Sequence, residues 1–132
     1  MRIGELTRRA GVTARTVRYY VSIGLMPEGA REGAGQHHYQ AEAVTRLKKI
    51  DQLKALGLSL DEIGSVIDLY FTDPSGQRPK EKVLAILHQH LRDTELKIGG
   101  LQQFRADLEA HIARFERWFE SRDQRRKGED DV

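Results

Sequence analysis

From Pro79 onward, apolar residues recur at alternating steps of three and four, and this spacing constrains the fold more than any other feature. The row holds eleven positions, of which Thr94 and Arg105 alone are polar. It runs through Leu84, Leu87, Leu91, Thr94, Ile98, Leu101, Arg105, Leu108, Ile112, Phe115 and Phe119. Five heptads of this pattern predict one long coiled-coil helix. A stripe so narrow has little to pack against within 132 residues, which favours a partner helix over packing on the chain's own domain.

The predicted helix covers residues 79–121. It starts at Pro79, because proline suits the first position of a helix. Gly99-Gly100 lies in its middle, and two glycines disfavour a helix by roughly 2 kcal/mol relative to two alanines, so the helix could bend or fray there. Residues 122–132 are charged and lack an apolar face. We therefore expect this tail to be disordered.

Near the N-terminus, two short helical patterns are joined by a turn that contains Gly11. The first is Ile3–Ala10, and Thr13 can cap the second. Two short helices joined in this way predict a helix-turn-helix. We expect Tyr20 to face the core and its neighbour Tyr19 to face outward.

The start of the second helix carries side chains that suit a DNA-reading helix: Arg15, Thr16, Arg18 and Tyr19. Such a recognition helix enters the major groove by its N-terminal end. Arginines can pair with guanine edges or phosphates, and threonine and tyrosine hydroxyls can reach phosphates.

The following segments complete a predicted DNA-binding domain over residues 1–72. Residues 27–35 are rich in glycine and charge and lead to Gln36-His37-His38-Tyr39, so two short strands here would form a wing. Residues 41–56 predict a third helix whose basic side chains, Arg46, Lys48, Lys49 and Lys54, lie mostly outward. Ser59-Leu60-Asp61-Glu62 has the spacing of a capping box at the start of a fourth helix.

The charge is uneven along the chain. Residues 1–56 hold ten Lys and Arg against five Asp and Glu, about +5, whereas residues 57–132 hold twelve against fifteen, about −3. This asymmetry could be ordinary surface variation, but beside a helix-turn-helix it favours nucleic acid as the partner of the first half.

Several classes of function lack support in the composition. The absence of cysteine removes disulfides, thiolate metal sites and thiol redox sensing. The chain has no Gly-rich phosphate loop and no paired-carboxylate site, so we expect neither an enzyme nor a cofactor. His37 and His38 would point to opposite faces of a strand, and His88 and His90 do not share a helix face, so neither pair predicts a metal site. A dimer site that includes His111 stays open.

No segment has the length and apolarity of a membrane span, and no signal-peptide pattern begins the chain. We therefore expect a cytoplasmic protein that does not bind membranes.

Several short motifs together resemble the MerR family of bacterial transcription regulators. They are Ile3-Gly4-Glu5-Leu6, Gly11-Val12-Thr13, Thr16-Val17-Arg18-Tyr19-Tyr20, Gly24-Leu25, the wing ending at Tyr39, and Leu56-Gly57-Leu58-Ser59-Leu60-Asp61-Glu62-Ile63. The resemblance covers residues 1–70 closely and residues 79–121 as a general plan.

The resemblance implies a mainly α fold, with a winged helix-turn-helix joined to a long helix that pairs antiparallel in a homodimer. Such dimers bind a pseudo-palindromic operator in double-stranded promoter DNA, and they bend and untwist the spacer so that RNA polymerase can engage both promoter hexamers. RNA polymerase would thus be an indirect partner. On this pattern the candidate DNA contacts are Thr13, Arg15, Thr16, Arg18 and Tyr19, with Tyr39, Arg31 and His37 on the wing.

This chain departs from the family pattern at two places. Val21 stands where the family usually has an acidic residue, and Gly35-Gln36-His37 replaces Gly-Tyr-Arg in the wing. A histidine can still donate to a phosphate, and does so more strongly when protonated.

The sequence does not specify a small-molecule effector. Family members that bind bulky drugs carry a separate effector domain, which we do not expect after the long helix, and those that sense metals usually use cysteines. Two other functions compete with the regulator: an excisionase-like DNA-architectural factor, and a protein-interaction module that has lost DNA binding.

Overall fold

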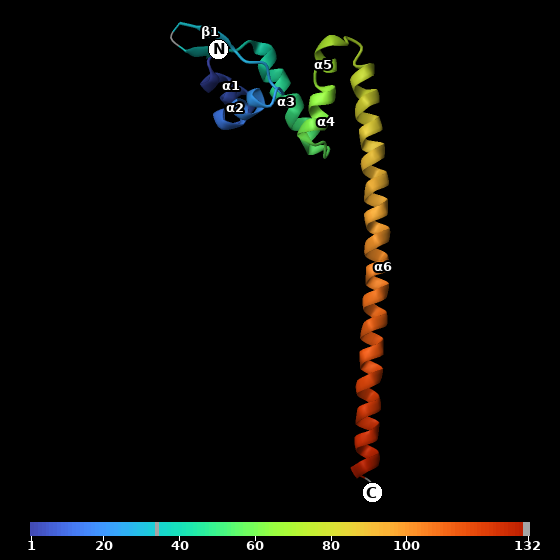
Figure 1. The fold of residues 1–132 in the computed structure, drawn as a ribbon. Coiled ribbons are helices and arrows are strands. Elements are labelled where there is room, and N and C mark those ends of the chain that lie inside the picture. The colour runs from blue at the N-terminus through green and yellow to red at the C-terminus, as the bar shows by residue number, and fades with distance from the viewer. Residues whose placement is uncertain (34, 131–132) are drawn as a thin grey trace. The chain divides into compact units, whose positions relative to one another are not determined.

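The computed structural model describes residues 1–33 and 35–130, which form helices and one antiparallel hairpin (Figure 1). The elements in chain order are α1 (Ile3–Ala10), α2 (Ala14–Ser22), β1 (Ala30–Glu32), β2 (Gln36–His38), α3 (Ala41–Ala55), α4 (Leu60–Val66), α5 (Leu69–Thr72) and α6 (Gln77–Asp130). They divide into a first unit, Met1–His88, and a second unit, Gln89–Val132. This mainly helical architecture with a wing confirms the predicted fold class.

The turn between α1 and α2 has the predicted chemistry. Gly11 ends α1 in the left-handed conformation, with φ 71°, and its N–H donates to the Thr7 carbonyl. Thr13 caps α2, since its Oγ1 accepts a hydrogen bond of 3.1 Å from the Thr16 N–H. The short connection therefore fixes the direction in which α2 leaves α1.

The core of the first unit is built from apolar side chains of α1 to α4, of the start of α6 and of the connecting loops. Val17 and Tyr20 of α2 are buried in it at 0% and 5% exposure. The whole buried set is Leu6, Val17, Tyr20, Leu25, Met26, Tyr39, Leu47, Ile50, Leu53, Leu58, Ile63, Val66, Ile67 and Val83. Because α2 contributes to this core at positions three apart, its opposite face remains outside.

A capping box starts α4, as the sequence predicts. The Ser59 N–H donates to Glu62 Oε1 at 2.8 Å, and the Glu62 N–H donates to Ser59 Oγ at 3.2 Å. Leu58 and Ile63, on either side of this box, are both buried. The burial of these two side chains and the two hydrogen bonds together fix the entry of the chain into α4.

From its place in α3 we expected Arg46 to point outward, but it does not. Its side chain is only 12% exposed, its Nε donates to the Leu25 carbonyl at 2.9 Å, and its Nη1 pairs with Asp68 Oδ1 at 2.9 Å. The guanidinium also lies 5.7 Å from the centre of the Phe71 ring. Arg46 therefore joins the loop after α2 to the junction of α4 and α5.

α6 begins beside a carboxylate and continues further than expected. Asp73 Oδ2 accepts a hydrogen bond of 2.8 Å from the Arg78 N–H, and this bond, followed by that from the Ser75 hydroxyl, lowers the pKa of Asp73. The helix passes through Gly99-Gly100 and reaches Asp130. The prediction of a disordered tail is thus wrong for residues 122–130, where arginine and other good helix formers extend the helix. Residues 131–132 lie outside the described residues.

Within the described residues of the second unit, the apolar row of α6 is exposed. Leu91, Ile98, Leu101 and Leu108 are 45–68% exposed, and Ile112, Phe115 and Phe119 are exposed as well. Large apolar side chains in a continuous row on one helix mark an interaction surface.

We predict that Ser59→Ala lowers the free energy of unfolding by about 1 kcal/mol, because the Glu62 amide loses its side-chain partner. Urea unfolding at one fixed protein concentration measures this change. Gln52→Ala, at an exposed position of α3, should leave the midpoint almost unchanged. An equal effect of the two substitutions would contradict the capping role of Ser59.

Candidate nucleic-acid interface

The outward face of α2 carries the residues predicted to read DNA. Arg15, Arg18 and Tyr19 are exposed, and Tyr19 is 52% exposed against 5% for Tyr20. The prediction that Tyr19 points outward and Tyr20 inward is confirmed. Val17 and Tyr20 hold α2 by its apolar side, so the two arginines project from the protein surface.

Two threonine hydroxyls lie at the start of the same helix. Thr13 Oγ1 and Thr16 Oγ1 are 2.9 Å apart and share one hydrogen bond, while Thr13 also accepts from the Thr16 amide. Two hydroxyls contain two hydrogens, and only one is used between them. The other can donate to a phosphate oxygen beside the N-terminal end of α2.

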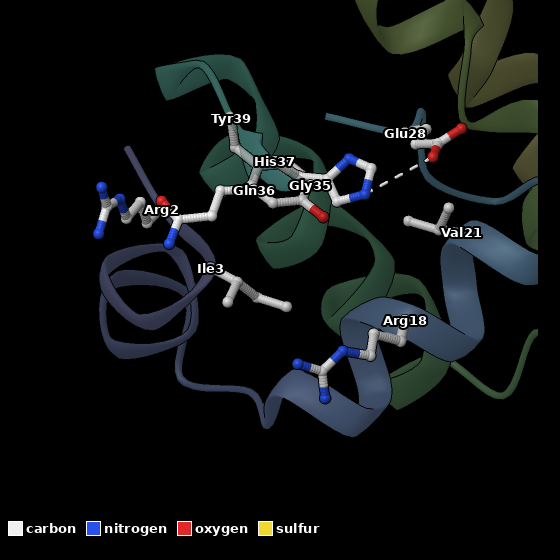
Figure 2. Close-up of a pocket in the computed structure, with 9 residues that line it drawn as sticks. All are labelled: Arg2, Ile3, Arg18, Val21, Glu28, Gly35, Gln36, His37 and Tyr39. Atoms are coloured by element: carbon white, nitrogen blue, oxygen red, sulfur yellow. Dashed lines mark ion pairs between the residues drawn. The ribbon is translucent and has the colours of Figure 1, made fainter. Parts of the chain in front are cut away.

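A hollow of about 430 Å³ separates α2 from the wing. Figure 2 shows Arg18 on α2 facing this hollow, His37 on the wing across from it, and Arg2 and Ile3 at the start of α1. Arg2 was not among the residues predicted from the sequence, because nothing local indicates that the start of α1 lies beside the wing. The hollow therefore collects basic side chains from three separate segments.

His37 is held in place by contacts within the protein. Its Nδ1 lies 2.9 Å from the Gly29 carbonyl oxygen, which can only accept, so Nδ1 carries a hydrogen. Its Nε2 lies 3.7 Å from Glu28 Oε1, as the dashed line in Figure 2 marks. Glu28 thus places a carboxylate beside the imidazole in the hollow.

The remaining wing candidates differ in position. Arg31 is exposed on β1, directly across the hairpin from His37. Tyr39, predicted as a DNA-facing position, is only 7% exposed and belongs to the core, which corrects that prediction. Burial raises the pKa of the Tyr39 hydroxyl, although the nearby Arg18 charge opposes the shift. Tyr39 lines the hollow, but most of its side chain is buried in the core.

A second hollow, of about 390 Å³, lies on the other side of α2. It is lined by Arg15, Thr16 and Tyr19 from α2, by Lys54 from α3, and by Leu60. The Lys54 ammonium donates to the Tyr20 hydroxyl at 3.5 Å, which holds it near α2. The sequence indicated only that Lys54 lies outward, because its proximity to α2 depends on how α3 packs.

A basic recognition helix between two hollows, with a hairpin beside it, defines a winged helix-turn-helix DNA-binding domain. Two family profiles match the chain: "MerR HTH family regulatory protein" over residues 1–69 and "MerR, DNA binding" over residues 44–111. The chain belongs to the MerR family of transcription regulators.

Individual relatives agree with this assignment. The uncharacterized HTH-type transcriptional regulator PA4778 of Pseudomonas aeruginosa is 35% identical, over 83% of this chain and 80% of its own length. HTH-type transcriptional regulator HmrR of Rhizobium leguminosarum bv. viciae is 34% identical, over 83% of this chain and 81% of its own length. The crystal structure of the transcription regulator PbrR691 from Ralstonia metallidurans CH34 in complex with lead(II) is 30% identical, with a TM-score of 0.68 over 83% and 85% of the two chains.

The described residues, 1–33 and 35–130, contain neither a candidate membrane span nor a candidate metal site. No helix in this range combines the length and apolarity needed to cross a membrane. No group of three or more histidine, aspartate or glutamate side chains in the same range is arranged to hold a metal ion.

We predict that Arg18→Ala weakens operator binding by about 1–3 kcal/mol, because a bidentate or charge-assisted contact is lost. Its thermal stability should match that of the parent, since Arg18 is exposed. Fluorescence anisotropy with labelled operator DNA measures the affinity. Arg92→Ala removes the same charge from α6 and serves as the control; equal affinities for the parent and Arg18→Ala would reject the contact.

Glu28→Gln should tighten operator binding by about 0.2–1 kcal/mol, the usual size of an exposed charge interaction. The substitution keeps the shape of the side chain and removes the carboxylate that faces the hollow. Glu42→Gln makes the same change outside this hollow and should have little effect. Weaker binding by Glu28→Gln would mean that the His37–Glu28 contact orders the wing and does not oppose the phosphate.

Proposed function

We propose that the protein is a homodimeric, sequence-specific regulator that binds promoter DNA and acts without catalysis. Each α2 enters the major groove of one half-site of an operator. The exposed face of α2, basic and flanked by two hollows, is the observation that carries this proposal. Such a regulator works in the bacterial cytoplasm, where the promoter DNA is.

The two hollows suit the two walls of a major groove. A helix in the groove has a phosphate backbone on either side, and basic or hydroxyl groups beside the helix can contact both. Arg2, Arg18 and His37 face one hollow, while Arg15 and Lys54 face the other. In this arrangement phosphate contacts orient α2, and Arg15, Arg18 and Tyr19 are the candidates for base contacts.

The dimer follows from the exposed apolar row of α6. A second copy offers an identical row, so pairing the two helices buries both. Two linked domains then bind two half-sites at a fixed spacing. If that spacing differs from the one in relaxed DNA, binding bends or untwists the spacer, and RNA polymerase then meets a promoter of altered geometry.

The nature of the relatives favours this function over the alternatives considered. PA4778 and HmrR are both named as transcriptional regulators. The neighbour PbrR691 was solved with lead(II), but this chain contains no cysteine and cannot offer a thiolate to a soft metal.

Footprinting of the purified protein on DNA selected from genomic fragments tests the function. Protection of a symmetric site within a promoter spacer supports the regulator. Protection beside a recombination junction would favour an excisionase-like factor, and the absence of any protection would favour a protein-interaction module.

Replacing Leu91 and Leu108 together by glutamate should yield monomers and abolish tight operator binding, because the charges oppose burial of the row and two half-sites are no longer held together. Analytical ultracentrifugation at micromolar concentration measures the mass. Ala110→Glu adds a charge at an exposed position outside the row and should leave the dimer intact. Sedimentation of the parent itself as a monomer would overturn the dimer.

A further inference from the structure

The apolar row of α6 is arranged symmetrically about the Gly99–Gly100 bond. Ile98 and Leu101 lie at equal distances from this bond along the chain, as do Leu91 and Leu108. The two polar members of the row, Thr94 and Arg105, are also equidistant from it. The further pairs Leu87 with Ile112, and Leu84 with Phe115, obey the same rule.

We propose that two copies of α6 pair antiparallel with their two-fold axis at the Gly99–Gly100 bond, so that Thr94 of each helix faces Arg105 of the other. The proposal rests on the proposed dimer and specifies its register. Any heptad row allows several antiparallel registers, because alternating steps of three and four are symmetric about many points. The polar residues distinguish among them.

The two neighbouring registers place both polar residues against apolar ones. With the axis midway between Thr94 and Ile98, Thr94 would face Ile98 and Arg105 would face Leu87. With the axis midway between Leu101 and Arg105, Arg105 would face Leu101 and Thr94 would face Ile112. A parallel pair would place the two Arg105 side chains opposite each other, and like charges in a seam repel. The register centred on Gly99–Gly100 avoids each of these contacts.

The hydrogen bonds that Thr94 and Arg105 make within their own helix allow this polar pair to lie in the interface between the two helices. The Thr94 hydroxyl donates to the His90 carbonyl of its own helix at 2.7 Å, so its methyl group can face the partner. Arg105 Nε pairs with Glu109 at 3.0 Å, and its side chain is 84% exposed. The aliphatic part of Arg105 can then cover the small threonine while its charged end remains at the solvent edge.

Gly99 and Gly100 do not provide close contact between the helices. Ile98 and Leu101 occupy the seam on either side, and heptad spacing places the two glycines on outer positions. A Cβ added at either glycine would meet nothing within 4 Å. The glycines therefore mark the axis without packing in it, and the Thr94–Arg105 pair sets the register.

Cysteine cross-linking tests the register, and the absence of native cysteine means that each introduced thiol reports alone. The double variant Leu91→Cys with Leu108→Cys should give a covalent dimer under mild oxidation, because the two positions face each other across the seam. Each single variant should give none, since Leu91 and its own copy would be about 25 Å apart along the axis.

Two further double variants serve as matched controls. Leu91→Cys with Leu101→Cys reports the axis midway between Thr94 and Ile98, and Leu91→Cys with Phe115→Cys reports the axis midway between Leu101 and Arg105. Cross-linking of either control, or of the single Leu91→Cys variant, in place of the predicted pair would overturn the register. If sedimentation shows no dimer at all, the proposed dimer fails instead.

The role of the polar pair has its own test. Adding Thr94→Leu and Arg105→Leu to each double-cysteine variant should keep the dimer and allow the control pairs to cross-link as well, because the row is then apolar throughout. Gln103→Leu, at an outer position of α6, should leave the original pattern unchanged. A pattern that still shows the Leu91–Leu108 pair alone would overturn the role of Thr94 and Arg105.

Discussion

The burial of Val17 and Tyr20 fixes the rotation of α2 about its own axis, and the rest of the interface depends on that rotation. Both side chains lie in the core, at 0% and 5% exposure. A helix held by these positions must present Arg15, Arg18 and Tyr19 on its other side. The Thr13 cap fixes where the helix starts, so these side chains are fixed along the axis as well as around it.

The two units differ in how their apolar side chains are buried. The first unit packs its short helices and the start of α6 around one core and leaves mainly polar side chains outside. The described part of the second unit is a single helix, and no other described residue of that unit covers its exposed apolar row. A partner therefore completes the second unit, and that partner also supplies the second recognition helix that a symmetric operator requires.

Much of the fold could be predicted because its signals are local. Gly11, Thr13 and the Ser59–Glu62 box act within a few residues, and the structure confirms each of them. The errors concern contacts between distant segments. Arg46 contacts Leu25 and Asp68, and Tyr39 is buried in the core. Neither the contacts of Arg46 nor the burial of Tyr39 can be predicted from the residues next to them in the sequence. For the same reason, the sequence alone does not place Arg2, Glu28 and Lys54 at the site: their positions beside α2 depend on how the wing and α3 pack.

The most direct test of the account is hydroxyl-radical footprinting, with a measured protein-to-DNA ratio, on the tightest-binding DNA selected from random sequence. A dimer that inserts two α2 helices should protect two inverted half-sites, with two chains bound per site and with related sequences in both halves. Protection of one half-site by a single chain, or binding with no preferred sequence, would contradict the claim that the outward face of α2 reads DNA within a symmetric dimer.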